Sequence, residues 1–195
     1  MEPAVAPLIF ITGGVRSGKS HFAEALTKQL CEPTHQLVYI ATGVAFDDEM
    51  ARRIAHHQQL RAGEGWQTIE HPTNFSTLPP HIPDNAVVLW DCATTWLGNE
   101  CYDDNAWQDQ ARLQARIEAM KEALWTLRKR GIPLVIVSNE MLDSPVPHYD
   151  ETRVYTQTLG ELHQWFAAEA TIAIEMEYGY KKIWKGADVF ENYFS

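Results

Sequence analysis

Residues 8–26 read Leu-Ile-Phe-Ile-Thr-Gly-Gly-Val-Arg-Ser-Gly-Lys-Ser-His-Phe-Ala-Glu-Ala-Leu. An apolar run typical of a strand leads into a glycine-rich loop, and a pattern typical of a helix follows. The loop, Gly13–Ser20, fits G-x-x-x-x-G-K-[ST], which cradles nucleotide phosphates when it joins a strand to a helix. Its glycines let backbone N–H groups turn toward phosphate oxygens, and the helix N-terminus adds a positive dipole. The alternative is a chance glycine turn, but both flanks match, so the sequence predicts a nucleotide site.

Two side chains of this loop have distinct expected roles. Lys19 would contact the β- and γ-phosphates and act in catalysis, and the Ser20 hydroxyl would ligate Mg²⁺. The triphosphate itself would be ATP or GTP. We expect the whole loop to contact the nucleotide, through Gly13, Gly14, Val15, Arg16, Ser17, Gly18, Lys19 and Ser20.

Beyond the loop, short apolar runs alternate with amphipathic segments. The runs are rich in Val and Ile with little polar alternation, which is typical of strands covered on both faces. Expected strands are 8–12, 37–42, 86–92, 134–138 and 171–177, with 181–185 as a further candidate, and expected helices include 46–61, 104–130 and a last one around 155–166. This alternation predicts an α/β, P-loop NTPase-like three-layer fold with a mostly parallel central sheet, in a single domain over residues 1–195. Segment 62–85, with its glycines and prolines, is expected to be a loop or short surface excursion, and 141–150 to be irregular.

Composition narrows the classes of partner. Sixteen Lys and Arg against 26 Asp and Glu give a formal charge of −10, so the surface field repels nucleic acid and anionic lipid. Three cysteines without C-x-x-C spacing are a poor disulfide or zinc pattern. No apolar run approaches the ~20 residues that cross a bilayer, so we expect no membrane span. With the cysteine pattern this predicts a cytoplasmic protein, and the charge predicts no nucleic-acid partner.

Residues with carboxylate side chains stand at the carboxyl ends of two of the expected strands. Asp91 follows Val87-Val-Leu-Trp and is a candidate Mg²⁺ ligand, the alternative being an ordinary strand-capping aspartate. Glu140 ends the strand after it and is either functional or structural. That strand continues Ser138-Asn-Glu-Met, so the Asn-Lys-x-Asp motif with which switch GTPases read guanine is missing there. A switch GTPase is therefore disfavoured.

A histidine-bearing helix is expected over residues 46–61, where acidic residues come first and basic ones follow. Met50, Ile54, His57 and Arg61 are spaced so that they share one face. A guanidinium one turn from His57 would favour the neutral imidazole and could also bind a phosphate. Neutral imidazole beside an α-phosphate is a competent nucleophile. The alternative is that His57 is a surface or packing residue.

Several motifs occur together in a fixed order, and they carry a family resemblance. After Gly13–Glu24 come Tyr39-Ile-Ala-Thr, Asp47-Asp-Glu-Met, Arg53-Ile-x-x-His57-x-x-x-Arg61, Trp66-x-Thr-x-Glu70, Leu89-x-Asp-Cys-x-Thr-x-Trp-Leu-x-Asn99 and Val137-Ser-Asn-Glu140. This pattern, over residues 8–140, resembles the bifunctional adenosylcobinamide kinase / adenosylcobinamide-phosphate guanylyltransferase family of cobalamin biosynthesis. The phosphate loop alone is unspecific, whereas its combination with the histidine helix is specific.

The resemblance implies two reactions. An NTP phosphorylates the aminopropanol hydroxyl of adenosylcobinamide, and GTP then transfers GMP through an enzyme histidine to give adenosylcobinamide-GDP. It maps the histidine onto His57, with His56 as the weaker candidate, and places Glu70 and Asp91 around the guanine nucleotide. Adenosylcobinamide and its phosphate are thus the implied partners, and a homotrimer the implied assembly.

After Glu140 the sequence departs from the family pattern. Met141-Leu-Asp-Ser-Pro-Val-Pro147 replaces a glycine-containing segment, and His163, Gln157 and Thr171 stand where the family tends to have Asn, Asp and Asp. Two alternatives therefore stay open, a single-activity P-loop kinase for another small alcohol and a non-catalytic GTP-binding module. The aromatic tail 186–195 would either close the core or dock on a neighbouring subunit.

Overall fold

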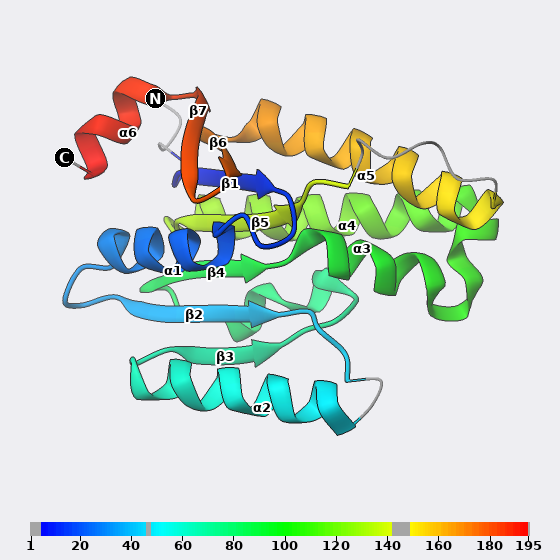
Figure 1. The fold of residues 1–195 in the computed structure, drawn as a ribbon, viewed down its shortest axis with the longest axis horizontal. Coiled ribbons are helices and arrows are strands. Elements are labelled where there is room, and N and C mark those ends of the chain that lie inside the picture. The colour runs from blue at the N-terminus through cyan, green and yellow to red at the C-terminus, as the bar shows by residue number, and fades with distance from the viewer. Residues whose placement is uncertain (1–4, 46–47, 142–148, 195) are drawn as a thin grey trace.

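The computed structural model describes residues 5–45, 48–141 and 149–194, and for seven residues of one helix (49, 50, 53, 54, 56, 57 and 60) it describes the backbone only. Its centre is a seven-stranded sheet in the order β3-β2-β4-β5-β1-β6-β7 (Figure 1). Neighbouring strands run parallel except at the edge, where β7 is antiparallel to β6. The strands are β1 (Leu8–Gly13), β2 (Gln36–Ala41), β3 (Gln67–Glu70), β4 (Ala86–Asp91), β5 (Leu134–Asn139), β6 (Ile172–Glu177) and β7 (Tyr180–Lys185).

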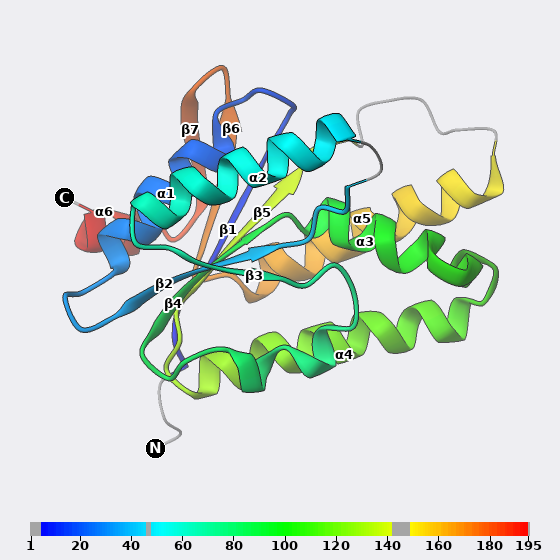
Figure 2. The same cartoon turned by 90° about the horizontal axis from the view of Figure 1, so that it is seen from below.

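Helices cover both faces of the sheet, so the predicted three-layer α/β fold is confirmed (Figure 2). On one face lie α1 (Lys19–Leu30), α2 (Asp48–Gly63) and α6 (Ala187–Phe194). On the other lie α3 (Ala93–Tyr102), α4 (Gln110–Lys129) and α5 (Asp150–Glu169). The central strands β1, β4 and β5 are apolar along most of their length, because alternate residues enter the cores on the two opposite faces of the sheet. Ile9 and Ile11 of β1 pack toward α1, whereas Leu8 and Phe10 pack on the opposite side.

The expected strands all form, but the interpretation of segment 62–85 as a loop was wrong. It contains β3, which pairs in parallel with β2 from Val38↔Gln67 to Ala41↔Glu70, followed by the short 3-10 turns Phe75–Thr77 and Pro79–His81. Four residues at a sheet edge, none of them buried, carry little apolar signal between a glycine turn and a proline. The pattern of apolar residues therefore did not predict β3, although this strand places Glu70 at the carboxyl end of the sheet beside Ala41.

One helix boundary also differs from the sequence prediction. The helix expected from residue 104 begins at Gln110, because Asp103–Gln108 forms a 3-10 segment and Asp109 caps the next helix by accepting a hydrogen bond from the Arg112 N–H at 3.1 Å. In the C-terminal tail, Phe190 of α6 is buried in the core on the α1 face of the sheet, which favours the core-closing alternative. Of the expected irregular segment 141–150, residues 142–148 lie outside the described ranges. Within those ranges no helix is both long and apolar enough to cross a membrane.

Candidate functional site

The phosphate loop joins β1 to α1, and its geometry explains two of its glycines. A Cβ at Gly13 would lie 2.3 Å from the carbonyl oxygen of Met176 on β6, so no side chain fits there. Gly18 precedes α1 with a φ of 90°, a left-handed conformation that glycine adopts without steric cost. The backbone can therefore turn sharply from the strand end into the helix N-terminus.

Hydrogen bonds from neighbouring elements brace this loop. The Glu140 N–H at the end of β5 donates to the Gly13 carbonyl at 2.9 Å, and the Gly179 N–H in the β6–β7 turn donates to the Ser17 carbonyl at 3.1 Å. Lys19 is buried and its ammonium donates to the Gly14 carbonyl at 3.1 Å, so its charge lies across the loop. A cavity of about 340 Å³, the loop cavity, opens beside it and is lined by Gly14–Ser17, Glu140, Met141 and Glu175–Tyr178.

A second cavity, of about 190 Å³, brings together three residues that the sequence analysis proposed separately. We call it the carboxylate pocket. Glu70 ends β3, Asp91 ends β4, and both pair with Ala41 of the strand between them. Arg61 enters from α2. The pocket is lined by Tyr39, Ala41, Gly43, Gln58, Arg61, Glu70, Asp91, Cys92 and Thr95. Since the carboxyl ends of parallel strands meet at one sheet edge, residues far apart in sequence converge here.

Side-chain contacts fix the walls of the carboxylate pocket. The Arg61 guanidinium lies over the Tyr39 ring, 3.5 Å from its centroid, and its Nε is 3.5 Å from Glu24 Oε1. Burial, reinforced by the negative charge of Asp91, raises the pKa of Tyr39, so the phenol stays neutral. The side-chain amide of Gln58 donates a hydrogen bond to Glu70. The pocket thus combines the carboxylates of Glu70 and Asp91 with the Arg61 guanidinium, whose position is fixed by Tyr39 and Glu24.

The predicted nucleophile, His57, belongs to α2, whose neighbouring residues Gln58 and Arg61 both line the carboxylate pocket. The side chains of His57 and His56 lie outside the described residues, so the position of either ring relative to a nucleotide stays a prediction. What the structure provides is the placement of the α2 backbone, which begins near the carboxyl ends of β2 and β3 and runs back alongside β3 (Figures 1 and 2).

A buried chain of polar groups under the end of β5 was not assigned a role from the sequence. His163 Nδ1 lies 3.8 Å from Glu140 Oε2, and His163 Nε2 is 2.7 Å from the Ser138 hydroxyl. That hydroxyl is 2.8 Å from the hydroxyl of Thr94, which also accepts the Asn139 N–H at 2.6 Å. Burial lowers the pKa of His163, and the Glu140 carboxylate offsets this only in part. The chain ties β5, α3 and α5 together, and the unusual His163 was its only sequence signal.

These observations define the class of protein: an α/β nucleotide-binding fold with a phosphate loop after its first strand and a second polar pocket two strands away. Solved structures of similar fold include the RadB recombinase, with a TM-score of 0.50 and 17% identity over 88% of this chain and 75% of that chain. The KaiC-like protein PH0186 from Pyrococcus horikoshii OT3 is similar at a TM-score of 0.50 and 12% identity, over 93% and 79% of the two chains. At these identities the likeness concerns the fold alone.

Sequence comparison places the chain more narrowly. Residues 9–182 match the family described as cobinamide kinase / cobinamide phosphate guanyltransferase, and the chain belongs to this family. It is 36% identical over 170 residues to the bifunctional adenosylcobalamin biosynthesis protein CobU of Escherichia coli K12, covering 84% of this chain and 91% of the relative. It is 39% identical over 158 residues to the corresponding CobP of Pseudomonas aeruginosa, covering 80% and 85%. The resemblance read from the motifs is confirmed.

Proposed function

We propose that this protein phosphorylates the aminopropanol hydroxyl of adenosylcobinamide and then guanylylates the resulting phosphate, giving adenosylcobinamide-GDP. Membership of the bifunctional family supports both activities. The observation that carries the proposal is that the loop cavity and the carboxylate pocket open at one edge of the sheet, at the ends of β1 and of β2–β4. A phosphate-holding loop and a pocket able to read a base are both needed to use GTP in two ways.

In the first reaction the phosphate loop stabilises charge. The substrate hydroxyl oxygen attacks the γ-phosphorus of ATP or GTP, the bond to the β–γ bridging oxygen breaks, and the hydroxyl proton passes to solvent as the nucleoside diphosphate leaves. Lys19 would exchange its contact with the Gly14 carbonyl for phosphate oxygens, and the loop N–H groups would meet the transferring group.

Mg²⁺ fits the donors present at this edge. The Ser20 hydroxyl at the start of α1 and the Asp91 carboxylate at the end of β4 are oxygen ligands, which Mg²⁺ prefers together with substrate phosphates. Among the described residues no group of three or more His, Cys, Asp or Glu is placed to hold a metal by itself. When bound with the nucleotide, the ion would lower the negative charge that meets Glu140, Glu175 and Glu177 in the loop cavity.

In the second reaction His57 is the proposed nucleophile. Its neutral imidazole nitrogen attacks the α-phosphorus of GTP, a P–N bond forms, and pyrophosphate leaves. An oxygen of adenosylcobinamide phosphate then attacks the same phosphorus, the P–N bond breaks, and the imidazole is restored. The Glu70 carboxylate would accept hydrogen bonds from guanine N1–H and N2–H, Asp91 would remain the Mg²⁺ ligand, and Arg61 would bind a phosphate. The homotrimer implied by the family resemblance stays a prediction, as do the cytoplasmic location expected from the sequence and a single domain over the whole chain.

The proposal is tested by following product masses with adenosylcobinamide, ATP or GTP, and Mg²⁺. Wild type should give the phosphate and then the GDP derivative. His57→Ala should give the phosphate alone, because only the second reaction uses the imidazole. Formation of the GDP derivative by His57→Ala would contradict the assignment. Phosphorylation of a different alcohol with no guanylyl transfer would support the single-activity kinase, and GTP binding without turnover would support the non-catalytic module.

A further inference from the structure

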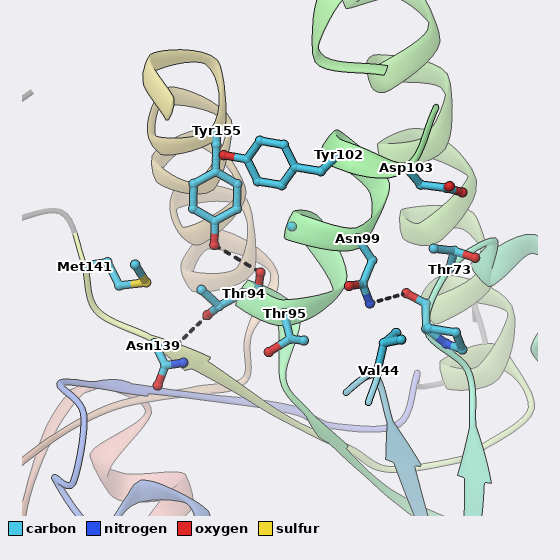
Figure 3. A pocket seen from close by; sticks show the side chains of 12 residues that line it. Val44, Thr73, Thr94, Thr95, Asn99, Tyr102, Asp103, Asn139, Met141 and Tyr155 are labelled. Carbon is cyan, nitrogen blue, oxygen red and sulfur yellow. Dashed lines mark hydrogen bonds between the residues drawn. The ribbon is translucent and has the colours of Figure 1, made fainter. Parts of the chain in front are cut away.

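A cavity of about 790 Å³ lies between α3, the first turns of α5 and the segments that follow β2, β3 and β5 (Figure 3). It is larger than the loop cavity or the carboxylate pocket. Figure 3 shows Met141 and Asn139 on one side of it, and Asn99 and Thr73 on the other. Its lining consists of Val44, Pro72, Thr73, Thr94, Thr95, Gly98, Asn99, Tyr102, Asp103, Asn139, Met141 and Tyr155.

The lining of this cavity selects against phosphate. Asp103 is the one charged residue among the described residues that line it, and it is an acid. Without a cation in the described wall, a triphosphate would lose its hydration and gain no opposite charge. The remaining surface is made of aliphatic, aromatic, hydroxyl and amide groups, which suits an uncharged ligand with a few polar atoms.

Hydrogen bonds hold the wall in place without an occupant. The Asn99 side-chain amide donates to the carbonyls of Thr42 at 2.8 Å and Pro72 at 3.0 Å, and so joins α3 to the segments after β2 and β3. The Tyr155 hydroxyl donates to the Thr94 carbonyl at 3.0 Å, which joins α5 to α3. At the rim, the half-exposed ring of Tyr102 lies 6.1 Å from that of Tyr155 at an interplanar angle of 24°. The cavity is therefore preorganised, with an aromatic face at its mouth.

The position of the cavity is as informative as its lining. It shares Met141 with the loop cavity and Thr95 with the carboxylate pocket, so it borders both. A ligand in it would lie beside the phosphate loop and beside the carboxylate pocket, the two parts of the proposed nucleotide site. The loop cavity and the carboxylate pocket share no described lining residue with each other, so of the three cavities only this one borders both of the others.

We propose that this cavity holds the uncharged part of the aminopropanol arm of the corrinoid acceptor, with the reacting hydroxyl or phosphate group outside it, and that the same site serves both reactions. The inference rests on the proposed function and adds where the acceptor binds. In this arrangement the corrinoid ring stays outside the cavity, with its edge against the half-exposed Tyr102 ring at the mouth. The arm presents its hydroxyl toward the loop in the first reaction and its phosphate toward the carboxylate pocket in the second.

Filling the cavity tests the proposal directly. Gly98 lies on α3, and a Cβ there would be 3.9 Å from the Tyr155 ring, an ordinary contact, so Gly98→Leu adds its bulk without a backbone clash. The KM for adenosylcobinamide in phosphorylation and for its phosphate in guanylylation should each rise about tenfold or more, as expected when a pocket loses the room of a few methylenes. Binding of a fluorescent GTP analogue should stay unchanged. The matched control is Ala115→Leu on the exposed face of α4, which adds a leucine away from every cavity described here.

A second variant keeps the test decisive if Gly98→Leu fails to bind the GTP analogue. Tyr102→Ala removes a half-exposed ring, so folding is not at risk, and both KM values should rise. An increase in only one of the two KM values, or in neither, while wild type carries out both reactions, would overturn the shared acceptor site and leave the proposed function standing. Absence of both reactions in wild type would overturn the proposed function and this proposal with it.

Discussion

The phosphate loop and the carboxylate pocket are built in opposite ways. The loop is eight consecutive residues whose backbone N–H groups are expected to contact phosphate, and only glycine fits where Gly13 passes β6. The carboxylate pocket is made of side chains from α2, β3 and β4 that meet because three strand ends are adjacent. A backbone cradle grips any triphosphate, whereas converging side chains can distinguish one base from another. The difference suggests a division of labour between holding a nucleotide and selecting it.

The largest effect is expected from the loop. Lys19→Ala should lower both phosphorylation and guanylyl transfer by about 10²–10³-fold, because one ammonium stabilises the developing charge in each reaction. The measurement is the rate of each product with wild type and variant at saturating nucleotide. Lys28→Ala, on the exposed side of the same helix, is the matched control. Loss of only one reaction would mean that two separate sites bind the triphosphate.

A smaller and more selective effect is expected from the carboxylate pocket. Glu70→Gln should reduce the preference for GTP over ATP in guanylyl transfer by about 10- to 100-fold, since hydrogen bonds to a charged acceptor contribute about 1.5–3 kcal/mol. The rate of phosphorylation should change little. The check is the ratio of kcat/KM values for the two nucleotides. Glu64→Gln, an exposed acid at the end of α2, is the control. An unchanged ratio would show that Glu70 does not read the base.

The smallest effect concerns the buried polar chain between the two regions. Because burial lowers the pKa of His163, the unfolded chain takes up a proton below about pH 6.5 that the folded ring resists. The free energy of unfolding should therefore fall as the pH is lowered through this range. It should fall less steeply in His163→Asn, which has no such proton to bind. Urea unfolding between pH 8 and pH 5 measures both profiles, and parallel profiles would contradict the account.

The sequence predicted the phosphate loop well and the carboxylate pocket only in part. A contiguous motif with a strand before it and a helix after it needs no knowledge of tertiary structure, so Gly13–Ser20 was found at once. Glu70 was singled out only by the family resemblance, because β3 is too short and too exposed to produce a pattern. The link from His163 through Ser138 to Thr94 spans three elements, and no spacing along the chain encodes it. The cavity of about 790 Å³ beside α3 and α5 likewise arises from loops and helix ends that meet only after folding.

The central claim is that α2 supplies a histidine that carries GMP from GTP to the acceptor phosphate within the second reaction. After incubation with GTP and Mg²⁺ but no corrinoid, followed by denaturation without acid and digestion, mass spectrometry should find GMP on the imidazole of His57. The label should persist in His56→Ala, be absent from His57→Ala, and be removed from wild type by adenosylcobinamide phosphate. A label retained by His57→Ala, or guanylyl transfer to the acceptor by that variant, would contradict the account.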